Sequence, residues 1–229
     1  MRFEELNWMD VENYLKRDNR LIVVLGSCEQ HGYLSLLTDT KVPTALADAV
    51  SRETGALVAP PLNFGNSPYF LTYPGTISLR ISTYINVVED IIRSVYGYGF
   101  RRILILNGHG GNEPVQARLS ELANELDGIR LSWYSWWTSG KIKEIAKKNN
   151  IPTTHASWLE AFKFTQITDL PQNPKEEVIN GGRILSGEET RQSAGDGNFG
   201  GPYKVADSIM EHVFDICVQE AINQLKSLG

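Results

Sequence analysis

Two short runs of apolar, largely β-branched residues constrain the fold more than any other feature of the sequence. LIVVLG covers residues 21–26 and RRILILNG covers residues 101–108. Strands buried on both faces of a parallel sheet have this nearly continuous apolar character, whereas half-exposed strands alternate apolar and polar residues. Two further strand-like runs are ALVAPPL at 56–62 and IRLSWYSWW at 129–137.

Segments with helical periodicity separate these runs. Helices are predicted over residues 42–54, from Ser82-Thr83 to about Tyr96, from Asn112 to Asp127, over 140–149 and over 204–228. Alternating strands and helices indicate an α/β fold with a mostly parallel sheet and helices on both of its faces. No linker interrupts the 229 residues, so we expect one domain over 1–229. The stretch 171–203 is rich in Gly, Pro and Asn and is expected to form a loop that lines or covers a site.

Charge and cysteine content restrict the possible partners. The chain has 22 Lys and Arg against 27 Asp and Glu, a net charge of −5. This balance argues against nucleic acid or an anionic membrane as a partner, because both favour a basic face. Two cysteines, Cys28 and Cys217, cannot form a disulfide framework, and the charged N-terminal segment does not resemble a signal peptide. We therefore expect a cytoplasmic protein.

Metal-ligating side chains follow the two most strand-like runs. Glu29 and His31 come directly after the first run, Asp39 follows eight residues later, and His109 comes after the second run. Ligands of parallel α/β sheets bind beyond the carboxyl ends of the strands, which is where these residues are predicted to lie. Carboxylate and imidazole ligands suit Zn²⁺, Mn²⁺ or Fe²⁺. Asp39 is the preferred candidate to bridge two such ions, which would activate water and polarise a carbonyl group.

Each of these residues also has a purely structural interpretation. A lone His at a strand end is more often a hydrogen-bonded or surface residue than a ligand, and Asp39 could be a turn or cap residue. Cys28 lies next to Glu29, so a cysteine nucleophile with a histidine base is an alternative, although a free Cys is more often a small buried apolar residue.

A second group of candidates lies near residues 154–160. His155 and Glu160 are five residues apart and can converge across a helix start, where they could shuttle a proton or add a ligand. One or two of the four indoles at Trp133, Trp136, Trp137 and Trp158 could wall a pocket for a small planar ligand. We select Trp158 as the substrate-binding candidate.

Five sequence blocks resemble the motifs of the creatininase (creatinine amidohydrolase) family, in the family's order. They are GSCEQHGYLSLLTDT at 26–40, YPGTISL at 73–79, NGHGGN at 107–112, THASWLEA at 154–161 and GGPYKVAD at 200–207. The resemblance implies a three-layer α/β/α sandwich, a divalent-metal centre, a hexamer of identical subunits and hydrolysis of a C–N bond in an amide, cyclic amide or formamide.

The matched motifs also imply roles for single residues. One ion would be held by Glu29, Asp39 and His109, and the other by His31 and Asp39. Glu160 would complete the site as a ligand or acid, and His155 would handle protons.

The glycine motif contributes a further role and a departure from the family pattern. The backbone amides of Gly110 and Gly111 could steady an oxyanion. In creatininase proper, a Glu lies two residues after the motif His, at the position of Gly111. This difference predicts a weaker second ion or dependence on Glu160. Many relatives also have a His near the position of Phe70.

The sequence thus supports three functional hypotheses. The first is a metal-dependent amidohydrolase acting on a small molecule through metal-activated water. The second is a metal-dependent hydrolase or isomerase of a keto-sugar or lactone. The third is a non-catalytic small-molecule-binding protein that kept the fold, which the presence of all four strand-end ligands disfavours.

Overall fold

The computed structural model describes residues 1–229 and contains one four-stranded sheet. Its strands are β1 (Arg20–Leu25), β2 (Leu57–Val58), β3 (Arg102–Asn107) and β4 (Arg130–Ser135). All neighbouring strands are parallel, in the order β2-β1-β3-β4. The prediction of a parallel α/β sheet is therefore confirmed.

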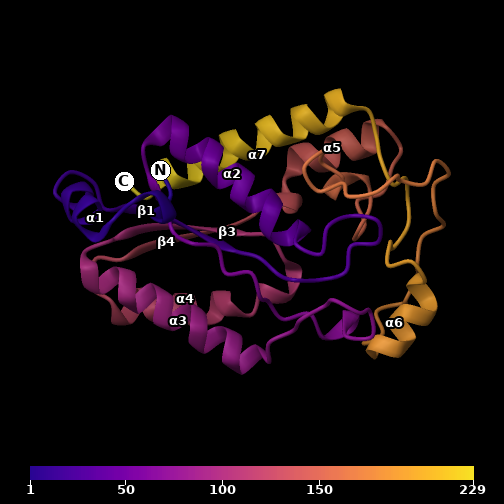
Figure 1. Ribbon diagram of the computed structural model, residues 1–229, viewed down its shortest axis with the longest axis horizontal. Coiled ribbons are helices and arrows are strands. Elements are labelled where there is room, and N and C mark those ends of the chain that lie inside the picture. The colour runs from indigo at the N-terminus through magenta and orange to yellow at the C-terminus, as the bar shows by residue number, and fades with distance from the viewer.

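The chain has seven α-helices, of which α6 lies away from the sheet and the other six cover its faces (Figure 1). They are α1 (Trp8–Leu15), α2 (Thr38–Thr54), α3 (Ile81–Tyr98), α4 (Val115–Glu125), α5 (Gly140–Lys148), α6 (Gly187–Ala194) and α7 (Asp207–Ser227). Helices α2, α5 and α7 cover one face and α1, α3 and α4 cover the other, which makes three layers. None of the helices is both long and apolar enough to cross a lipid bilayer.

The strand side chains alternate between two apolar cores. Ile22 and Val24 pack against α2 and α7, whereas Leu21 and Val23 pack against α3 and α4. All four side chains are at most 2% exposed, as the apolar run predicts for a strand covered on both faces. This double burial holds β1 and β3 in one register, with Leu25 paired to Asn107 at their carboxyl ends.

Several predicted boundaries were wrong. The second strand is two residues long instead of seven, because Pro60 and Pro61 have no N–H to donate to a ladder. Helix α2 begins at Thr38, so Asp39 lies in its first turn. Asn112 does not begin a helix; it ends the 3₁₀ turn Gly110–Asn112, and its buried amide donates to the carbonyl of Gly26.

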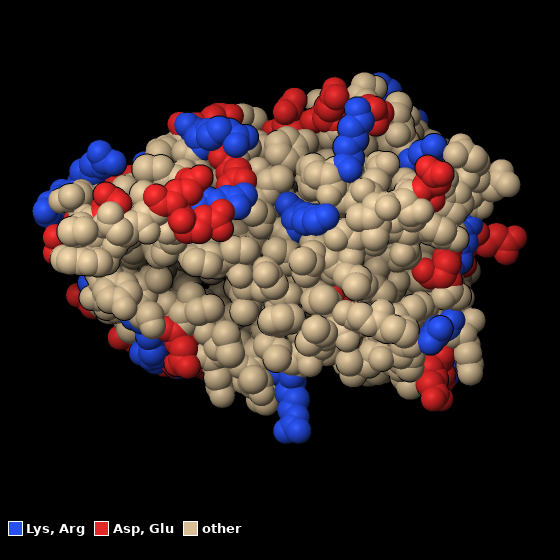
Figure 2. Space-filling view, viewed as in Figure 1, with Lys and Arg blue, Asp and Glu red and all other residues tan.

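The surface agrees with the mildly acidic composition. On the face drawn in Figure 2, Lys and Arg side chains lie among Asp and Glu side chains and form no continuous basic patch. The predicted loop region 171–203 is mostly irregular but contains α6, which packs against the 3₁₀ turn Pro68–Phe70.

Candidate metal centre

The two strand-end segments converge because β1 and β3 are neighbours. Ser27–His31 leaves the end of β1, and His109 follows the end of β3. Asp39, from the first turn of α2, lies between the two histidines. Glu29, His31 and Asp39 are at most 4% exposed, and His109 is 8% exposed. The four residues predicted as ligands are thus brought together in one buried cluster.

Asp39 is the centre of this cluster. Its Oδ1 atom lies 2.9 Å from Nε2 of His31, and its Oδ2 atom lies 3.0 Å from Nδ1 of His109. Glu29 approaches His109 at 3.5 Å, and Glu160 approaches His31 at 3.6 Å. Three groups with metal-ligand spacing result. Two of them, Glu29–Asp39–His109 and His31–Asp39–Glu160, share Asp39, and the third is Glu29–His31–His155.

The hydrogen bonds of the two histidines suit a metal site. Nδ1 of His31 lies 3.1 Å from the carbonyl oxygen of Glu29, and Nε2 of His109 lies 2.9 Å from that of Asn66. When each of these nitrogens donates its proton to the carbonyl, the other ring nitrogen presents a lone pair toward Asp39. Metal-binding histidines are commonly fixed in this way by a backbone carbonyl.

Three polar atoms of the cluster lack a hydrogen-bond partner: Oε2 of Glu29, Nε2 of His31 and Oδ2 of Asp39. Burying polar atoms without partners is costly, and native proteins rarely do so without a reason. These atoms belong to the two groups that share Asp39, so a cation bound in each group would satisfy all three. The donor set of carboxylate oxygens and imidazole nitrogens fits a divalent transition metal.

The electrostatics of the cluster follow from burial and close charge. Burial raises the pKa of Glu29 to about 7, and the nearby His109 offsets this only in part. Burial also opposes protonation of the histidines, but carboxylates outweigh it and raise the pKa of His109 to about 9 and that of His31 well above its ordinary value. The pKa of Asp39 stays low because both histidines outweigh its burial. Without a metal, protons on the two histidines therefore balance the buried carboxylates.

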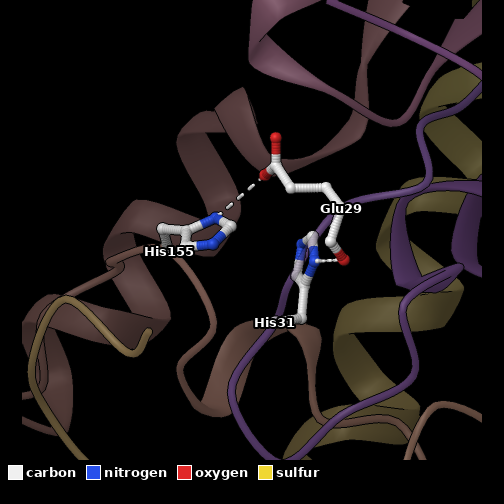
Figure 3. A group of neighbouring side chains, drawn as sticks. All are labelled: Glu29, His31 and His155. Atoms are coloured by element: carbon white, nitrogen blue, oxygen red, sulfur yellow. Dashed lines mark hydrogen bonds and ion pairs between the residues drawn. The ribbon is translucent and has the colours of Figure 1, made fainter. Parts of the chain in front are cut away.

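His155 approaches the cluster from the loop after α5. Its Nδ1 atom lies 3.8 Å from Oε1 of Glu29, and its ring lies 4.5 Å from that of His31 (Figure 3). The ring stacks on Phe70 at 4.6 Å. Burial and the positive charge of His31 lower the pKa of His155 to about 4, so this imidazole is neutral at neutral pH. Phe70 thus supports the His155 ring.

Glu160 ends the 3₁₀ turn Trp158–Glu160. Its Oε2 atom accepts a 2.6 Å hydrogen bond from the backbone N–H of Ala156, and its Oε1 atom faces His31. The carboxylate is therefore held from one side by the protein and directed at the cluster with its other oxygen.

A cavity of about 270 Å³ opens onto the cluster. It is lined by Asp39, Gly108, His109, Gly110, Trp137, Thr153, Thr154, His155, Leu159 and Glu160. The selection of Trp158 as a substrate-binding residue disagrees with this structure. Its side chain is fully buried in the core, where Nε1 donates to the carbonyl of Pro152, and Trp137 is the indole on the cavity wall. Apolar periodicity alone could not distinguish the two indoles.

Gly111 is packed so closely that it cannot carry a side chain. A Cβ atom there would lie 1.9 Å from the carbonyl oxygen of Asn66 and 2.5 Å from Nε2 of His109. The Asn66 carbonyl that fixes His109 thus occupies the space that a Glu would need. Gly110 lines the cavity, but Gly111 does not, so the expected pair of substrate-contacting glycines is reduced to Gly110.

Cys28 is poorly placed for nucleophilic attack. Its buried thiol donates to the carbonyl of Gly75 at 3.3 Å, and burial raises the pKa of the thiol. A thiolate nucleophile needs a lowered pKa and access to substrate, and Cys28 does not line the cavity. The geometry therefore favours the metal interpretation over the cysteine alternative.

Two residues of the site were not selected from the sequence. The side-chain amide of Gln30 lies 3.0 Å from Nε2 of His155, and the hydroxyl of Ser67 lies 3.2 Å from Nε2 of His109. Gln30 could have been found from its place between Glu29 and His31. Ser67 carries no such signal, because only the fold brings it to His109.

Comparison with known proteins identifies the family of this chain. The family model described as creatinine amidohydrolase (Creatininase) matches residues 4–225. The chain is 28% identical over 165 residues to a 3-dehydro-scyllo-inosose hydrolase of Thermotoga maritima, which covers 69% of this chain and 53% of that protein. It is 36% identical over 130 residues to a creatinine amidohydrolase of Pseudomonas putida, covering 52% and 50% respectively. The matches span about half the length of these curated relatives.

Solved structures share the whole fold. A mutant creatininase (type II) superposes with a TM-score of 0.85 at 21% identity, covering 99% of this chain and 97% of that chain. Creatininase structures described as Zn-Zn type and as Mn each give a TM-score of 0.83 at 21% identity, covering 99% and 97%. Because the family model matches nearly the whole chain, this protein belongs to the creatininase family.

Proposed function

We propose that this protein is a divalent-metal-dependent amidohydrolase that cleaves the C–N bond of a small amide, cyclic amide or formamide. One observation carries the proposal: the buried carboxylate of Asp39 is shared by two groups of potential ligands, with its two oxygens directed at different histidines. Three atoms of the cluster lie close to opposite charges but have no hydrogen-bond partner, which supports cations among them.

The cofactor proposal is two ions per subunit, drawn from Zn²⁺, Mn²⁺ and Fe²⁺. Glu29, Asp39 and His109 would hold one ion, and His31, Asp39 and Glu160 would hold the other. The Zn-Zn and Mn descriptions of related creatininases support this choice of metals. Bound divalent ions lower the pKa of water and polarise a carbonyl group, which is the chemistry that amide hydrolysis needs. Because Gly111 excludes a carboxylate from its position, Glu160 supplies the third ligand of the second group.

The chain's own residues would manage protons and charge. His155 is neutral at neutral pH and lies against Glu29, so it can accept a proton and pass it to the leaving nitrogen. Glu160 is the alternative proton carrier, since one of its oxygens faces the cluster. The backbone of Gly110 lies on the cavity wall, where its amide could support an oxyanion.

The cavity favours a compact substrate. Its volume of about 270 Å³ lies at the lower end of small-molecule sites. Its lining contains no Lys or Arg. Trp137 and Leu159 offer apolar contact area, and Thr153 and Thr154 offer hydroxyl groups. These features support a small, neutral, polar substrate.

A keto-sugar or lactone substrate is the second candidate. It is supported by the similarity to the inosose hydrolase of Thermotoga maritima, which covers more of this chain than the creatinine amidohydrolase does. Parallel assays of small amides and of cyclic polyol ketones, each with added Mn²⁺ or Zn²⁺, separate the two candidates. Turnover confined to the ketones would replace the amidohydrolase proposal.

We propose that the protein assembles into a homo-oligomer, a hexamer by family resemblance, and acts on a small molecule in the cytoplasm. The two cysteines are buried and unpaired, which supports a reducing environment. Neither a nucleic acid nor a membrane is proposed as a partner.

Metal analysis tests the proposed function. Protein purified without chelator is compared with Asp39→Ala and with the control Asp90→Ala, which removes an exposed carboxylate from α3. We expect two ions per subunit in the wild type and in the control, and loss of both in Asp39→Ala because both groups lose their shared ligand. Equal trace metal in wild type and Asp39→Ala would show the mechanism to be wrong. Loss of hydrolysis on metal removal in wild type, with Cys28→Ser unaffected, would exclude the thiol alternative.

A further inference from the structure

Ala156, between His155 and the 3₁₀ turn that carries Glu160, has an unusual backbone conformation. Its φ angle is +56°, a left-handed value that residues other than Gly, Asn and Asp rarely adopt. This conformation directs the Ala156 N–H to Oε2 of Glu160 at 2.6 Å, while Oε1 of Glu160 faces His31 at 3.6 Å. The direction of the Glu160 carboxylate therefore depends on a backbone conformation that Ala156 would not adopt by itself.

Asn198 supplies the contact that holds this peptide. Its side chain is completely buried, and Nδ2 donates to the carbonyl of Ala156 at 2.9 Å. Its Oδ1 accepts from the N–H of Gly200 at 2.5 Å, so both ends of the amide are used. The N–H of the neighbouring Phe199 donates to the carbonyl of His155 at 3.0 Å. The segment 198–200 is thus bonded directly to His155, a proposed proton carrier, and to Ala156, which follows it.

Lys175 fixes the turn that carries Asn198. Its ammonium group donates to Oδ1 of Asp196 at 2.5 Å, to the carbonyl of Asn198 at 2.7 Å and to the carbonyl of Ala194. All three donors of the lysine are therefore used within residues 194–198, which limits the movement of this turn.

Gly197 fixes the same turn against the first sequence block. Its carbonyl accepts from Nε2 of Gln30 at 3.1 Å, and a Cβ atom at Gly197 would lie 1.7 Å from Oε1 of Gln30. Gln30 lies between Glu29 and His31 and also contacts His155. The turn therefore joins the strand-end ligands to the segment that carries His155 and Glu160.

We propose that Asn198 is a positioning residue for the metal centre: it holds Ala156 in its left-handed conformation and thereby directs Glu160, together with His155, at the cluster around Asp39. The inference rests on the proposed function for its consequence in catalysis. Its structural part concerns only the Ala156 peptide and can be measured in metal-free protein.

The variant Asn198→Asp tests this role, since it keeps the size and the acceptor oxygen of Asn198 but removes the N–H that Ala156 accepts. Asn223→Asp, on the exposed side of α7, makes the same chemical change and serves as the control. The first measurement is hydrogen exchange of the Ala156 amide in chelator-treated protein. We expect exchange at least about 10-fold faster in Asn198→Asp and unchanged in the control.

The second measurement is Mn²⁺ affinity, obtained by titration with detection of free Mn²⁺ by electron paramagnetic resonance. Loss of a supporting contact commonly weakens metal binding by about 10- to 100-fold. In Asn198→Asp we expect a loss of this size for the ion assigned to His31, Asp39 and Glu160. Adding Ala156→Gly should recover part of the affinity, because glycine adopts the left-handed conformation without strain. A structural role unrelated to this conformation would not be rescued in this way.

Each outcome is decisive. Unchanged Ala156 exchange in Asn198→Asp, or faster exchange with wild-type Mn²⁺ affinity, would overturn the inference. Wild-type protein that binds no divalent metal, with the exchange result as expected, would contradict the proposed function but not the hold on Ala156. If Asn198→Asp does not fold, Lys175→Met is the second variant. It removes the three hydrogen bonds of Lys175 to the same turn, and Lys175 is partly exposed, so the protein should tolerate the change. Wild-type exchange and affinity in that variant would overturn the inference.

Discussion

Nε2 of His31 lies 2.9 Å from Oδ1 of Asp39 and 3.6 Å from Oε1 of Glu160, but it makes no well-aligned hydrogen bond to either carboxylate. Nδ1 of the same ring is directed at the carbonyl oxygen of Glu29. The imidazole is thus fixed with one nitrogen and exposes the other to a carboxylate. A bound cation would give this fully buried nitrogen a partner.

Replacing His31 should remove one ion and leave the other. In His31→Ala the group formed by Glu29, Asp39 and His109 is intact, so we expect the metal content to fall from two ions to one per subunit. His212→Ala, an exposed histidine on α7, is the matched control and should keep both ions. Elemental analysis measures the content, and two ions in His31→Ala would contradict the assignment of its group.

Alanine should destabilise the protein at Gly111 but not at the adjacent Gly110. A Cβ atom at Gly111 would collide with Asn66 and His109, whereas nothing lies within 4 Å of a Cβ atom at Gly110. Overpacking of this kind costs about 1–3 kcal/mol, and the displaced His109 should also bind metal less tightly. Chemical denaturation and metal titration measure both effects. Similar stability and affinity in Gly111→Ala and Gly110→Ala would show that the Asn66–His109 contact does not set this position.

The two indoles near the site should have different roles. Trp158 is completely buried, so Trp158→Ala should lower the free energy of unfolding by about 3–5 kcal/mol. Trp137 lines the cavity and is only partly buried, so Trp137→Ala should cost less stability and should mainly raise KM for the substrate. Steady-state kinetics and urea unfolding of both variants distinguish these effects. A raised KM in a well-folded Trp158→Ala protein would contradict the placement of Trp158.

The turn that carries Asn198 should contribute stability that is lost in acid. Burial would raise the pKa of Asp196, but hydrogen bonds from Lys175 and Tyr203 outweigh it and hold this pKa below its ordinary value. Because the pKa is lower in the folded chain, the contribution is present above about pH 4 and disappears as the pH falls through the folded-state pKa. We expect Asp196→Asn to be less stable than wild type by about 1 kcal/mol or less at pH 6, given the partial exposure of the carboxylate.

Urea unfolding of metal-free wild type and Asp196→Asn between pH 6 and pH 3 checks this dependence. The difference between the two proteins should shrink as the pH falls. A difference that stays constant or grows toward low pH would contradict the role assigned to the pair of Lys175 and Asp196.

Local sequence patterns predicted the central sheet and the clustering of the candidate ligands at its edge. The runs 21–26 and 101–108 are apolar throughout because β1 and β3 are covered on both faces, and this property is visible in the sequence. Once two parallel strands are neighbours, the residues that follow them must meet. The convergence of Glu29 and His31 with His109 follows from that topology.

The remaining features depend on contacts between distant segments. The distinction between Trp137 and Trp158 is set by how the segment after α5 folds back on the core, which periodicity does not encode. The collision at Gly111 comes from the carbonyl of Asn66, more than forty residues away. The role of Asn198 depends on the left-handed conformation of Ala156. The sequence does not predict this conformation, because alanine rarely adopts it.

In the proposed centre, Asp39 would be a ligand of both metal ions. Anomalous scattering from crystals grown with Mn²⁺ or Zn²⁺, with data on both sides of the metal absorption edge, would locate the ions relative to this carboxylate. We predict two metal peaks on opposite sides of the Asp39 carboxylate, one within ligand distance of Glu29 and His109 and the other within ligand distance of His31 and Glu160. A single peak that does not contact Asp39, or no peak within this cluster at saturating metal, would contradict the account.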